Sequence, residues 1–262
     1  MDSLAVYLVQ RASGLDPAEN RAALDVVGQI AADRAHPDLV VFPEVFARDF
    51  GAPGSDVAPF AERLDGPFVT RLVELAATHA TTVVAGMFET SGDPARPFNT
   101  LVVVDRSGLR ASYRKIHLYD SFGYRESDRL TAGALEPLVV DVGGWQVGLM
   151  TCYDLRFPEL ARALVDRGAE VLLVPAAWVA GERKAEHWRT LARARAIENT
   201  VYVAAVGQPA PRYTGHSTVV APDGDVVLEL DDGDGQLGFA ELRREVLDAA
   251  RSSNPSLANR RL

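Results

Sequence analysis

The stretch WQVGLMTCYDLRFPELARALVDRGAEVLLVPAA (residues 145–177) decides the fold, because its apolar and polar segments alternate as strand, turn, helix and strand. The apolar run before Cys152 is typical of a buried strand. Polar residues and a proline follow and introduce a helix at about 157–167, and EVLLVPAA (170–177) is a second buried strand. Cys152, the only cysteine in the chain, therefore lies where a strand enters a turn. It is either a buried filler or a nucleophile.

The same alternation continues toward the N-terminus. Apolar β-prone runs predict strands at 4–10, 38–44, 82–89, 99–105 and 109–115. A helix is expected over 16–35, with Asp16 as its N-cap and Pro17 at its first position, and a second one over 67–80. DRSG joins the last two strands as the turn of a hairpin.

Toward the C-terminus, residues 116–136 lack a clear period and predict a long functional loop. Hairpins are expected at 137–151 and 217–230, helices at 184–198 and 241–250, and strands at 201–208 and 236–241. Hairpins mixed with strand–helix units favour an α/β fold with a mixed sheet, or with two sheets packed face to face and helices outside. We expect one domain over 1–262, with a polar C-terminal tail from about residue 251.

Composition narrows the classes of function. The 262 residues carry a formal net charge of -9, so no basic footprint for nucleic acid or an anionic membrane is present. A single cysteine forms no intramolecular disulfide, and no apolar run approaches the roughly 20 residues that a bilayer requires. The five histidines are scattered and predict no zinc site. These features favour a cytoplasmic protein with a small-molecule partner.

Three ionisable residues close predicted strands: Glu44, Lys115 and Cys152. Each alone has an ordinary interpretation as a strand end leaving the core or, for the cysteine, as packing. Together they form a sensible set for nucleophilic catalysis. A thiol attacks as a thiolate and needs a base, a carboxylate can accept its proton, and a lysine can stabilise an oxyanion.

Three motifs, VVFPEVF, YRKIHLYD and TCYDLRFPEL, occur in the order and approximate separation seen in the nitrilase (carbon–nitrogen hydrolase) superfamily, which this chain resembles up to about residue 245. The resemblance implies a four-layer α-β-β-α sandwich with two mixed sheets and a Glu–Lys–Cys triad. Glu44 is then the general base, Lys115 the oxyanion stabiliser and Cys152 the nucleophile. It also implies that Glu126 positions the lysine or the substrate and that the backbone N–H of Tyr153 is a second oxyanion donor. The resemblance implies no metal and no cofactor. It also implies a homodimer or a higher homo-oligomer.

The tyrosine and aspartate that follow Cys152 resemble the amidase branches, close to the omega-amidase and deaminated glutathione amidase group. This implies hydrolysis of a small carboxamide, one carrying a carboxylate, through a cysteine thioester with release of ammonia. The alternatives are a nitrilase or an N-carbamoyl amino acid hydrolase with the same triad and, outside enzymes, a silent binding subunit. Arg156 and Asp154 are candidates to bind a substrate carboxylate or to pair with other groups.

Overall fold

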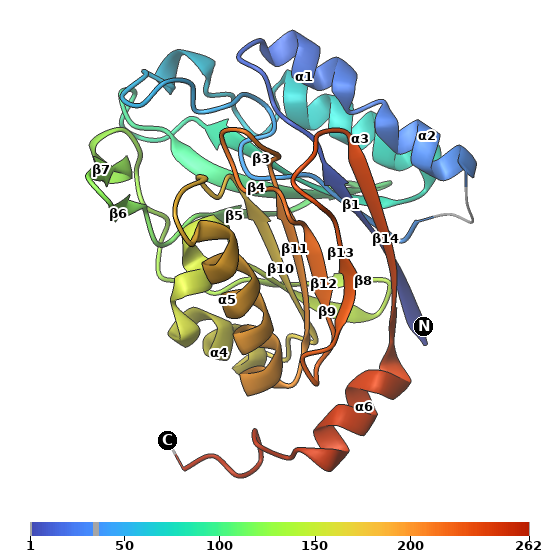
Figure 1. The fold of residues 1–262 in the computed structure, drawn as a ribbon. Coiled ribbons are helices and arrows are strands. Elements are labelled where there is room, and N and C mark those ends of the chain that lie inside the picture. The colour runs from blue at the N-terminus through green and yellow to red at the C-terminus, as the bar shows by residue number, and fades with distance from the viewer. Residues whose placement is uncertain (1, 34–36, 262) are drawn as a thin grey trace.

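The computed structural model describes residues 2–33 and 37–261. Two six-stranded sheets lie face to face, and helices cover the outer face of each (Figure 1). The strand orders are β14-β1-β2-β3-β4-β5 and β13-β12-β11-β10-β9-β8, and both sheets mix parallel and antiparallel pairs. The predicted α/β class and four-layer sandwich are therefore confirmed.

The first sheet has a parallel centre, β1-β2-β3, with antiparallel strands at both edges. Its strands are β1 (Ser3–Gln10), β2 (Leu39–Val41), β3 (Thr82–Glu89), β4 (Phe98–Asp105), β5 (Gly108–Arg114) and β14 (Gln236–Arg243). Strand β1 is apolar on both faces, because Val6 and Leu8 point to the second sheet while Tyr7 and Val9 pack under the helices. The predicted hairpin of β4 and β5 is present.

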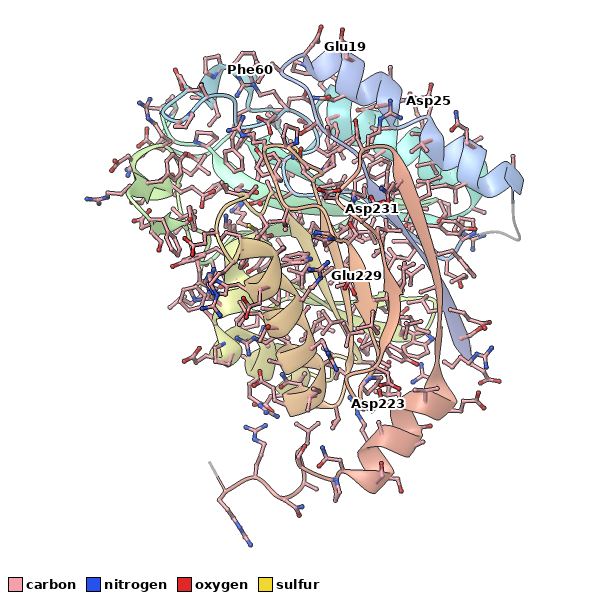
Figure 2. All side chains as sticks on the ribbon, viewed as in Figure 1. Glu19, Asp25, Phe60, Asp223, Glu229 and Asp231 are labelled. Atoms are coloured by element: carbon pink, nitrogen blue, oxygen red, sulfur yellow. The ribbon has the colours of Figure 1, made fainter. Side chains whose placement is uncertain are left out.

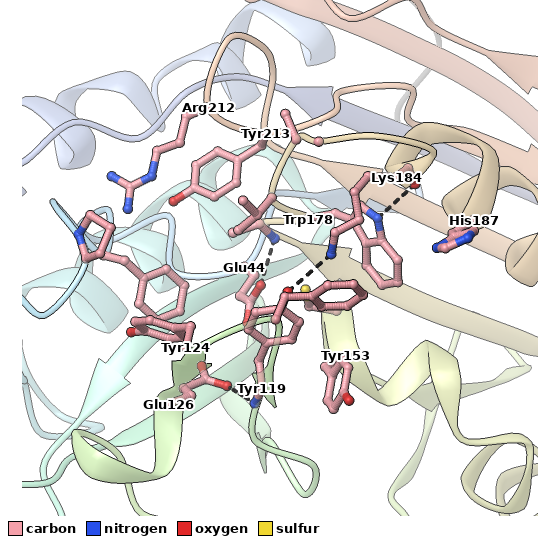
Figure 3. Close-up of a pocket in the computed structure, with 18 of the residues that line it drawn as sticks. Glu44, Tyr119, Tyr124, Glu126, Tyr153, Trp178, Lys184, His187, Arg212 and Tyr213 are labelled. Atoms are coloured by element: carbon pink, nitrogen blue, oxygen red, sulfur yellow. Dashed lines mark hydrogen bonds between the residues drawn. The ribbon is translucent and has the colours of Figure 1, made fainter.

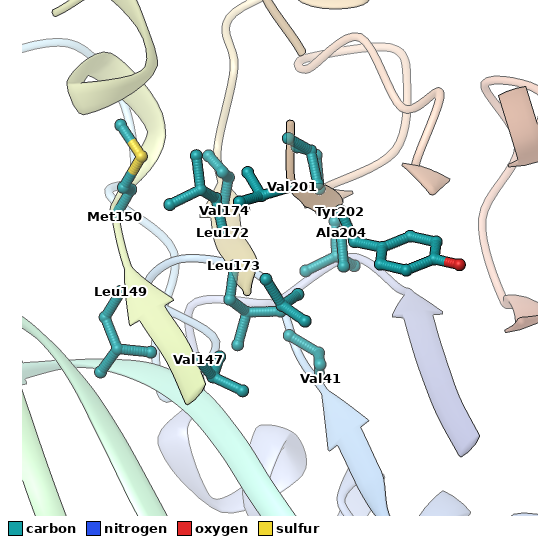
Figure 4. Packing of buried hydrophobic residues seen from close by; sticks show 14 of the residues in the cluster. Val41, Val147, Leu149, Met150, Leu172, Leu173, Val174, Val201, Tyr202 and Ala204 are labelled. Carbon is teal, nitrogen blue, oxygen red and sulfur yellow. The ribbon is translucent and has the colours of Figure 1, made fainter. Parts of the chain in front are cut away.

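The second sheet carries the strand–helix–strand stretch of residues 145–177. Its strands are β8 (Val139–Val142), β9 (Trp145–Leu149), β10 (Val171–Ala176), β11 (Tyr202–Gly207), β12 (Thr218–Val220) and β13 (Val226–Glu229). Side chains from both sheets form one core cluster, in which Val41 of β2 joins Val147, Leu149 and Leu173 (Figure 4). This shared core fixes the carboxyl ends of β2, β5 and β9 relative to one another.

The helices lie on the outer faces (Figure 1). The first sheet is covered by α1 (Pro17–Ala23), α2 (Val26–Asp33) and α3 (Pro67–His79), and the second by α4 (Pro158–Asp166) and α5 (Lys184–Asn199). Helix α6 (Arg244–Ser253) lies at one end of the sandwich, where Leu247 joins the shared core. No helix in the described ranges is both long and apolar enough to cross a membrane.

The prediction of a single helix over 16–35 is wrong, because the chain forms α1 and α2 with a break at Leu24 and Asp25. The N–H groups of Leu24 and Asp25 bond to carbonyls three residues earlier, at 3.3 and 3.1 Å, which tightens the chain and interrupts the α-helical ladder. Asp16 does cap the first helix, accepting from the N–H of Ala18 at 2.7 Å. Residues 34 and 35 of the predicted helix lie outside the described residues.

The segment predicted as a long loop, residues 116–136, has structure of its own. It contains a small hairpin of β6 (Asp120–Ser121) and β7 (Tyr124–Arg125), followed by a 3-10 turn, η2 (Glu126–Asp128). Phe122 and Gly123 form the hairpin tip with positive φ angles of 54° and 79°. The turn begins at Glu126, so the hairpin returns the chain to the ends of the strands.

The surface reflects the acidic composition. Glu19 and Asp25 lie on the outer face beside α1, while Asp223 and Glu229 flank β13 on the opposite sheet (Figure 2). Glu229 forms an ion pair with Arg189 of α5 at 2.8 Å. Acidic side chains are thus exposed beside both sheets, and one of them pairs with an arginine of α5.

Candidate active site

Three strand ends open on one cavity of about 910 Å³. Glu44 follows β2 and Lys115 follows β5 in the first sheet, while Cys152 follows β9 in the second. Glu126, from the turn after the small hairpin, lines the same cavity (Figure 3). The structure therefore brings together all four side chains singled out from the sequence, although they are up to 108 positions apart in the chain.

A tight turn after β2 places Glu44 inside the protein. Val45 adopts a φ of 48°, and the turn lies so close to β3 that a Cβ on Gly86 would come within 2.2 Å of the Val45 nitrogen. Glu44 is only 1% exposed. Its Oε1 accepts from Asn99 Nδ2 and its Oε2 from the N–H of Ala177, both at 2.7 Å. Donors from both sheets thus fix this carboxylate.

Lys115 is held between two carboxylates. Its Nζ donates to Glu44 Oε1 at 2.9 Å and to Glu126 Oε2 and Oε1 at 2.9 and 3.1 Å. Burial alone lowers the pKa of Lys115, but the neighbouring Glu126 and Glu44 outweigh burial and hold that pKa well above its ordinary value. The amine is consequently a cation at neutral pH.

Glu126 completes this charge cluster from the other side. Its side chain is 2% exposed, and Oε2 also accepts from the N–H of Tyr119 at 2.6 Å. Burial raises the pKa of Glu126, and the negative Glu44 adds to this effect while Lys115 opposes it. Its carboxylate thus contacts the lysine directly.

Cys152 opens a 3-10 turn, η3 (Cys152–Arg156), directly after β9. Its φ of 47° is unusual for a residue with a side chain and makes a sharp elbow at the strand end. Burial, followed by the negative charge of Glu44, raises the pKa of the thiol well above its ordinary value, and Lys115 acts in the opposite direction. Cys152 is therefore a neutral thiol beside a carboxylate that can accept its proton.

The cavity wall opposite Glu126 is cationic. Lys184, Arg156 and His187 all line it, and an Arg156 nitrogen lies 3.4 Å from His187 Nδ1. The Lys184 ammonium contacts Tyr119 Oη at 3.2 Å and lies 4.5 Å from the centre of the Phe122 ring. Burial, together with Arg156, lowers the pKa of Lys184. Within the described parts of the chain, no carboxylate forms an ion pair with Lys184 or Arg156.

Several residues of the site could not be singled out from the sequence. Lys184 is the first residue of α5, where it resembles an ordinary solvated helix end, and Asn99 resembles an interior strand residue. Arg212 and Tyr213 come from the short connection between β11 and β12 and line the rim, where Asp49 accepts from both at 2.6 Å. None follows a motif that would distinguish it from an ordinary structural residue.

The remaining candidates divide between the cavity and its support. Tyr153 lines the cavity, whereas Asp154 is fully buried behind the elbow and pairs with His117 at 2.7 Å. Asp154 therefore pairs with protein groups, which was one of its two interpretations. Among residues 2–33 and 37–261, no group of three or more histidine, cysteine, aspartate or glutamate side chains could hold a metal ion.

The sequence and the fold of this chain match those of known proteins. The family model described as carbon-nitrogen hydrolase matches residues 6–252. A hydrolase of Mycobacterium tuberculosis is 40% identical over 98% of this chain and 95% of its own length. A deaminated glutathione amidase of Escherichia coli O157:H7 is 38% identical over 90% of each chain. The crystal structure of a Saccharomyces cerevisiae protein, a member of branch 10 of the nitrilase superfamily, superposes with a TM-score of 0.88 at 28% identity, covering 100% of this chain and 97% of the other.

Proposed function

Since the chain belongs to the carbon–nitrogen hydrolase family, we propose that it hydrolyses a small carboxamide in this cavity, with Cys152 as nucleophile and Glu44 as general base. The observation that carries the proposal is the position of a buried carboxylate in one cavity with both other members of the set. Glu44 lies 2.9 Å from the Lys115 ammonium, and its charge raises the pKa of the Cys152 thiol that lines the same cavity. The general class of amidase-type carbon–nitrogen hydrolase agrees with the named relatives.

The chemistry proceeds in two halves. Glu44 accepts the thiol proton while the sulfur of Cys152 attacks the amide carbonyl, and Lys115 with the backbone N–H of Tyr153 stabilises the oxyanion. Glu44 then returns the proton to the amide nitrogen, the C–N bond breaks and ammonia departs. The acyl group remains bound to Cys152 as a thioester. Water, deprotonated by Glu44, attacks the thioester, and the products are a carboxylate and the free thiol. Glu126 keeps Lys115 in position throughout.

We also propose that the substrate carries a carboxylate, as deaminated glutathione and small α-keto acid amides do. The support is the cationic wall, where Lys184 and Arg156 face the cavity and the Nε of Arg156 is buried without a hydrogen-bond partner among the described residues. A charged hydrogen bond contributes about 1.5–3 kcal/mol, so its loss weakens binding roughly 10- to 100-fold.

A panel of amides tests the reaction and the substrate class. Ammonia release is measured with α-ketoglutaramate, deaminated glutathione, a neutral aliphatic amide, a nitrile and an N-carbamoyl amino acid. We expect turnover of the carboxylate-bearing amides, and Cys152→Ala to abolish it. Turnover of the nitrile or carbamoyl compound alone would contradict the amidase assignment.

Lys184→Met tests the carboxylate subsite separately. We expect KM for α-ketoglutaramate to rise roughly 10- to 100-fold, because a charge-assisted contact is lost. KM for the neutral aliphatic amide is the internal control and stays within about twofold of wild type, since that substrate has no group for the lysine to bind. Equal effects on both substrates would contradict this role.

For the whole molecule, we propose one catalytic domain over 1–262, located in the cytoplasm and assembled as a homodimer. Ile197 near the end of α5 and Val226 and Val227 of β13 are 44%, 45% and 48% exposed, and they offer apolar area for self-association. Light scattering should give twice the 28.3 kDa chain mass. A single-chain mass at micromolar concentration would contradict the dimer.

A further inference from the structure

Asp154 is a buried carboxylate that lies behind Cys152 and does not line the cavity. Four donors satisfy it. Its Oδ2 accepts from the N–H of Thr151 at 2.8 Å and from Tyr113 Oη at 2.7 Å, and its Oδ1 accepts from the N–H of His117 at 3.1 Å and contacts His117 Nδ1 at 2.7 Å. Burying a carboxylate costs free energy unless hydrogen bonds compensate the charge. These four contacts provide that compensation, and they also hold the side chain in one position.

The donors come from the two segments that carry the proposed lysine and nucleophile. Tyr113 and His117 stand two residues before and two residues after Lys115, at the end of β5 in the first sheet. Thr151 immediately precedes Cys152, at the end of β9 in the second sheet. One carboxylate therefore connects the backbone on both sides of Lys115 to the elbow that presents the thiol.

Other contacts strengthen this connection. The His117 ring stacks on Phe157, at the end of η3, with centroids 3.7 Å apart and an interplanar angle of 8°. The N–H of Asp154 donates to the carbonyl of Thr151 at 2.9 Å and closes the turn around Cys152. Burial, followed by the Asp154 carboxylate, raises the pKa of Tyr113 well above its ordinary value, so the phenol remains a donor.

We propose that Asp154 is a positioning residue that fixes the Lys115 ammonium relative to the Cys152 sulfur across the two sheets. The inference rests on the proposed roles of Lys115 and Cys152. An oxyanion donor acts only if it lies about 3 Å from the position of the developing charge, and a displacement of about 1 Å costs up to about 100-fold in rate. The left-handed φ of Cys152 also requires surroundings that hold it, and the Asp154 contacts to Thr151 supply part of that support.

The test is Asp154→Asn, which keeps the shape of the side chain but leaves it unable to accept from all four donors. We expect kcat for α-ketoglutaramate to fall about 10- to 100-fold with KM within about twofold, because Lys184 of the proposed carboxylate subsite belongs to α5 and not to the η3 turn that Asp154 holds. The rate of Cys152 alkylation by iodoacetamide, which requires no substrate, should fall in the same variant.

Glu170→Gln is the matched control at the opposite end of the same sheet. Glu170 also bridges two segments through its carboxylate, accepting from the N–H of Gln146 at 3.0 Å and pairing with Arg244. A loss of stability that acts on turnover only through unfolding would affect both variants alike. We expect this control to lower the melting temperature without changing kcat or the alkylation rate of the folded protein.

Tyr113→Phe removes one hydrogen-bond donor to Asp154 and so tests the positioning role a second time. We expect kcat to fall at least threefold with KM unchanged, and a double variant with Asp154→Asn to be less impaired than the product of the two single effects. This variant decides the question if Asp154→Asn does not fold.

The positioning role of Asp154 and the proposed function are contradicted by different results. The positioning role is overturned if wild-type Cys152 is alkylated readily and the folded Asp154→Asn protein has the same kcat and the same alkylation rate as wild type. Tyr113→Phe decides in the same way if Asp154→Asn does not fold. The proposed function stands in either case. If wild-type protein releases no ammonia from any amide of the panel, the proposed function fails first.

Discussion

Gly86 controls the position of Glu44, and Gly86→Ala tests this control. The added Cβ would lie 2.2 Å from the nitrogen of Val45 and 2.8 Å from the Cα of Glu44. The shorter distance is about 1.2 Å below the 3.4 Å at which ordinary contact begins. The obstacle is backbone and not a flexible side-chain tip, so the turn that carries Glu44 must move away from β3.

The size of this movement sets the expected loss. Displacing a catalytic group by about 1 Å costs roughly 100-fold in rate, equivalent to about 2.7 kcal/mol of transition-state stabilisation. Overpacking at a buried site also destabilises the fold by about 1–3 kcal/mol, which lowers the melting temperature by roughly 2–12 °C for a chain of this size. Gly86→Ala should therefore fold and lose about 100-fold in kcat/KM.

The assay is steady-state ammonia release from α-ketoglutaramate, at a temperature well below the melting point measured by circular dichroism. Gly92→Ala is the matched control, because nothing lies within 4 Å of its added Cβ and Gly92 does not adopt a positive φ. We expect this control to match wild type in both readouts. A folded Gly86→Ala protein with kcat/KM within about twofold of wild type would refute the reasoning.

Other predictions concern the groups around the thiol. Glu126→Gln should lower kcat about 10- to 100-fold while Cys152 remains available to iodoacetamide, because a neutral amide no longer holds Lys115; wild-type turnover would remove Glu126 from the site. Asn99→Leu removes the 2.7 Å donor to Glu44 and should lower kcat at least threefold, measured as ammonia release, with unchanged kcat as the contrary result. Without substrate, alkylation of Cys152 should accelerate with rising pH beyond about 8.5, the ordinary thiol pKa, because the thiol pKa is raised; a plateau below pH 7 would show a resident thiolate.

Much of the fold follows from local patterns in the sequence. Apolar runs bounded by turn residues predict the strands of both sheets, and hairpins such as β4–β5 follow from the turn between them. The break between α1 and α2 is different, because Leu24, Val27 and Ile30 keep helical spacing on one buried face while the α-helix is interrupted at Leu24 and Asp25. The spacing of apolar residues in the sequence indicates which side of a helix is buried. It does not indicate where the hydrogen bonds of the helix become shorter-range.

The candidate site divides in the same way. Glu44, Lys115 and Cys152 are visible in the sequence because each is a reactive residue that closes a predicted strand, and because the motifs that contain them resemble those of one family. Asn99 is not visible, since its contact with Glu44 depends on the alignment of β4 beside β3 and on the turn that lies above them. Lys184 reaches the cavity only because its helix follows β10 on the second sheet. Such roles arise from pairing between distant segments.

The most direct test of the central claim is intact-mass spectrometry of the enzyme quenched with acid during turnover of a slowly hydrolysed amide. We predict a covalent adduct whose added mass equals the substrate minus ammonia, located on the peptide that contains Cys152 and absent from Cys152→Ala. Ammonia release with no adduct on Cys152 at any quench time, or turnover retained by Cys152→Ala, would contradict the assignment of Cys152 as the nucleophile.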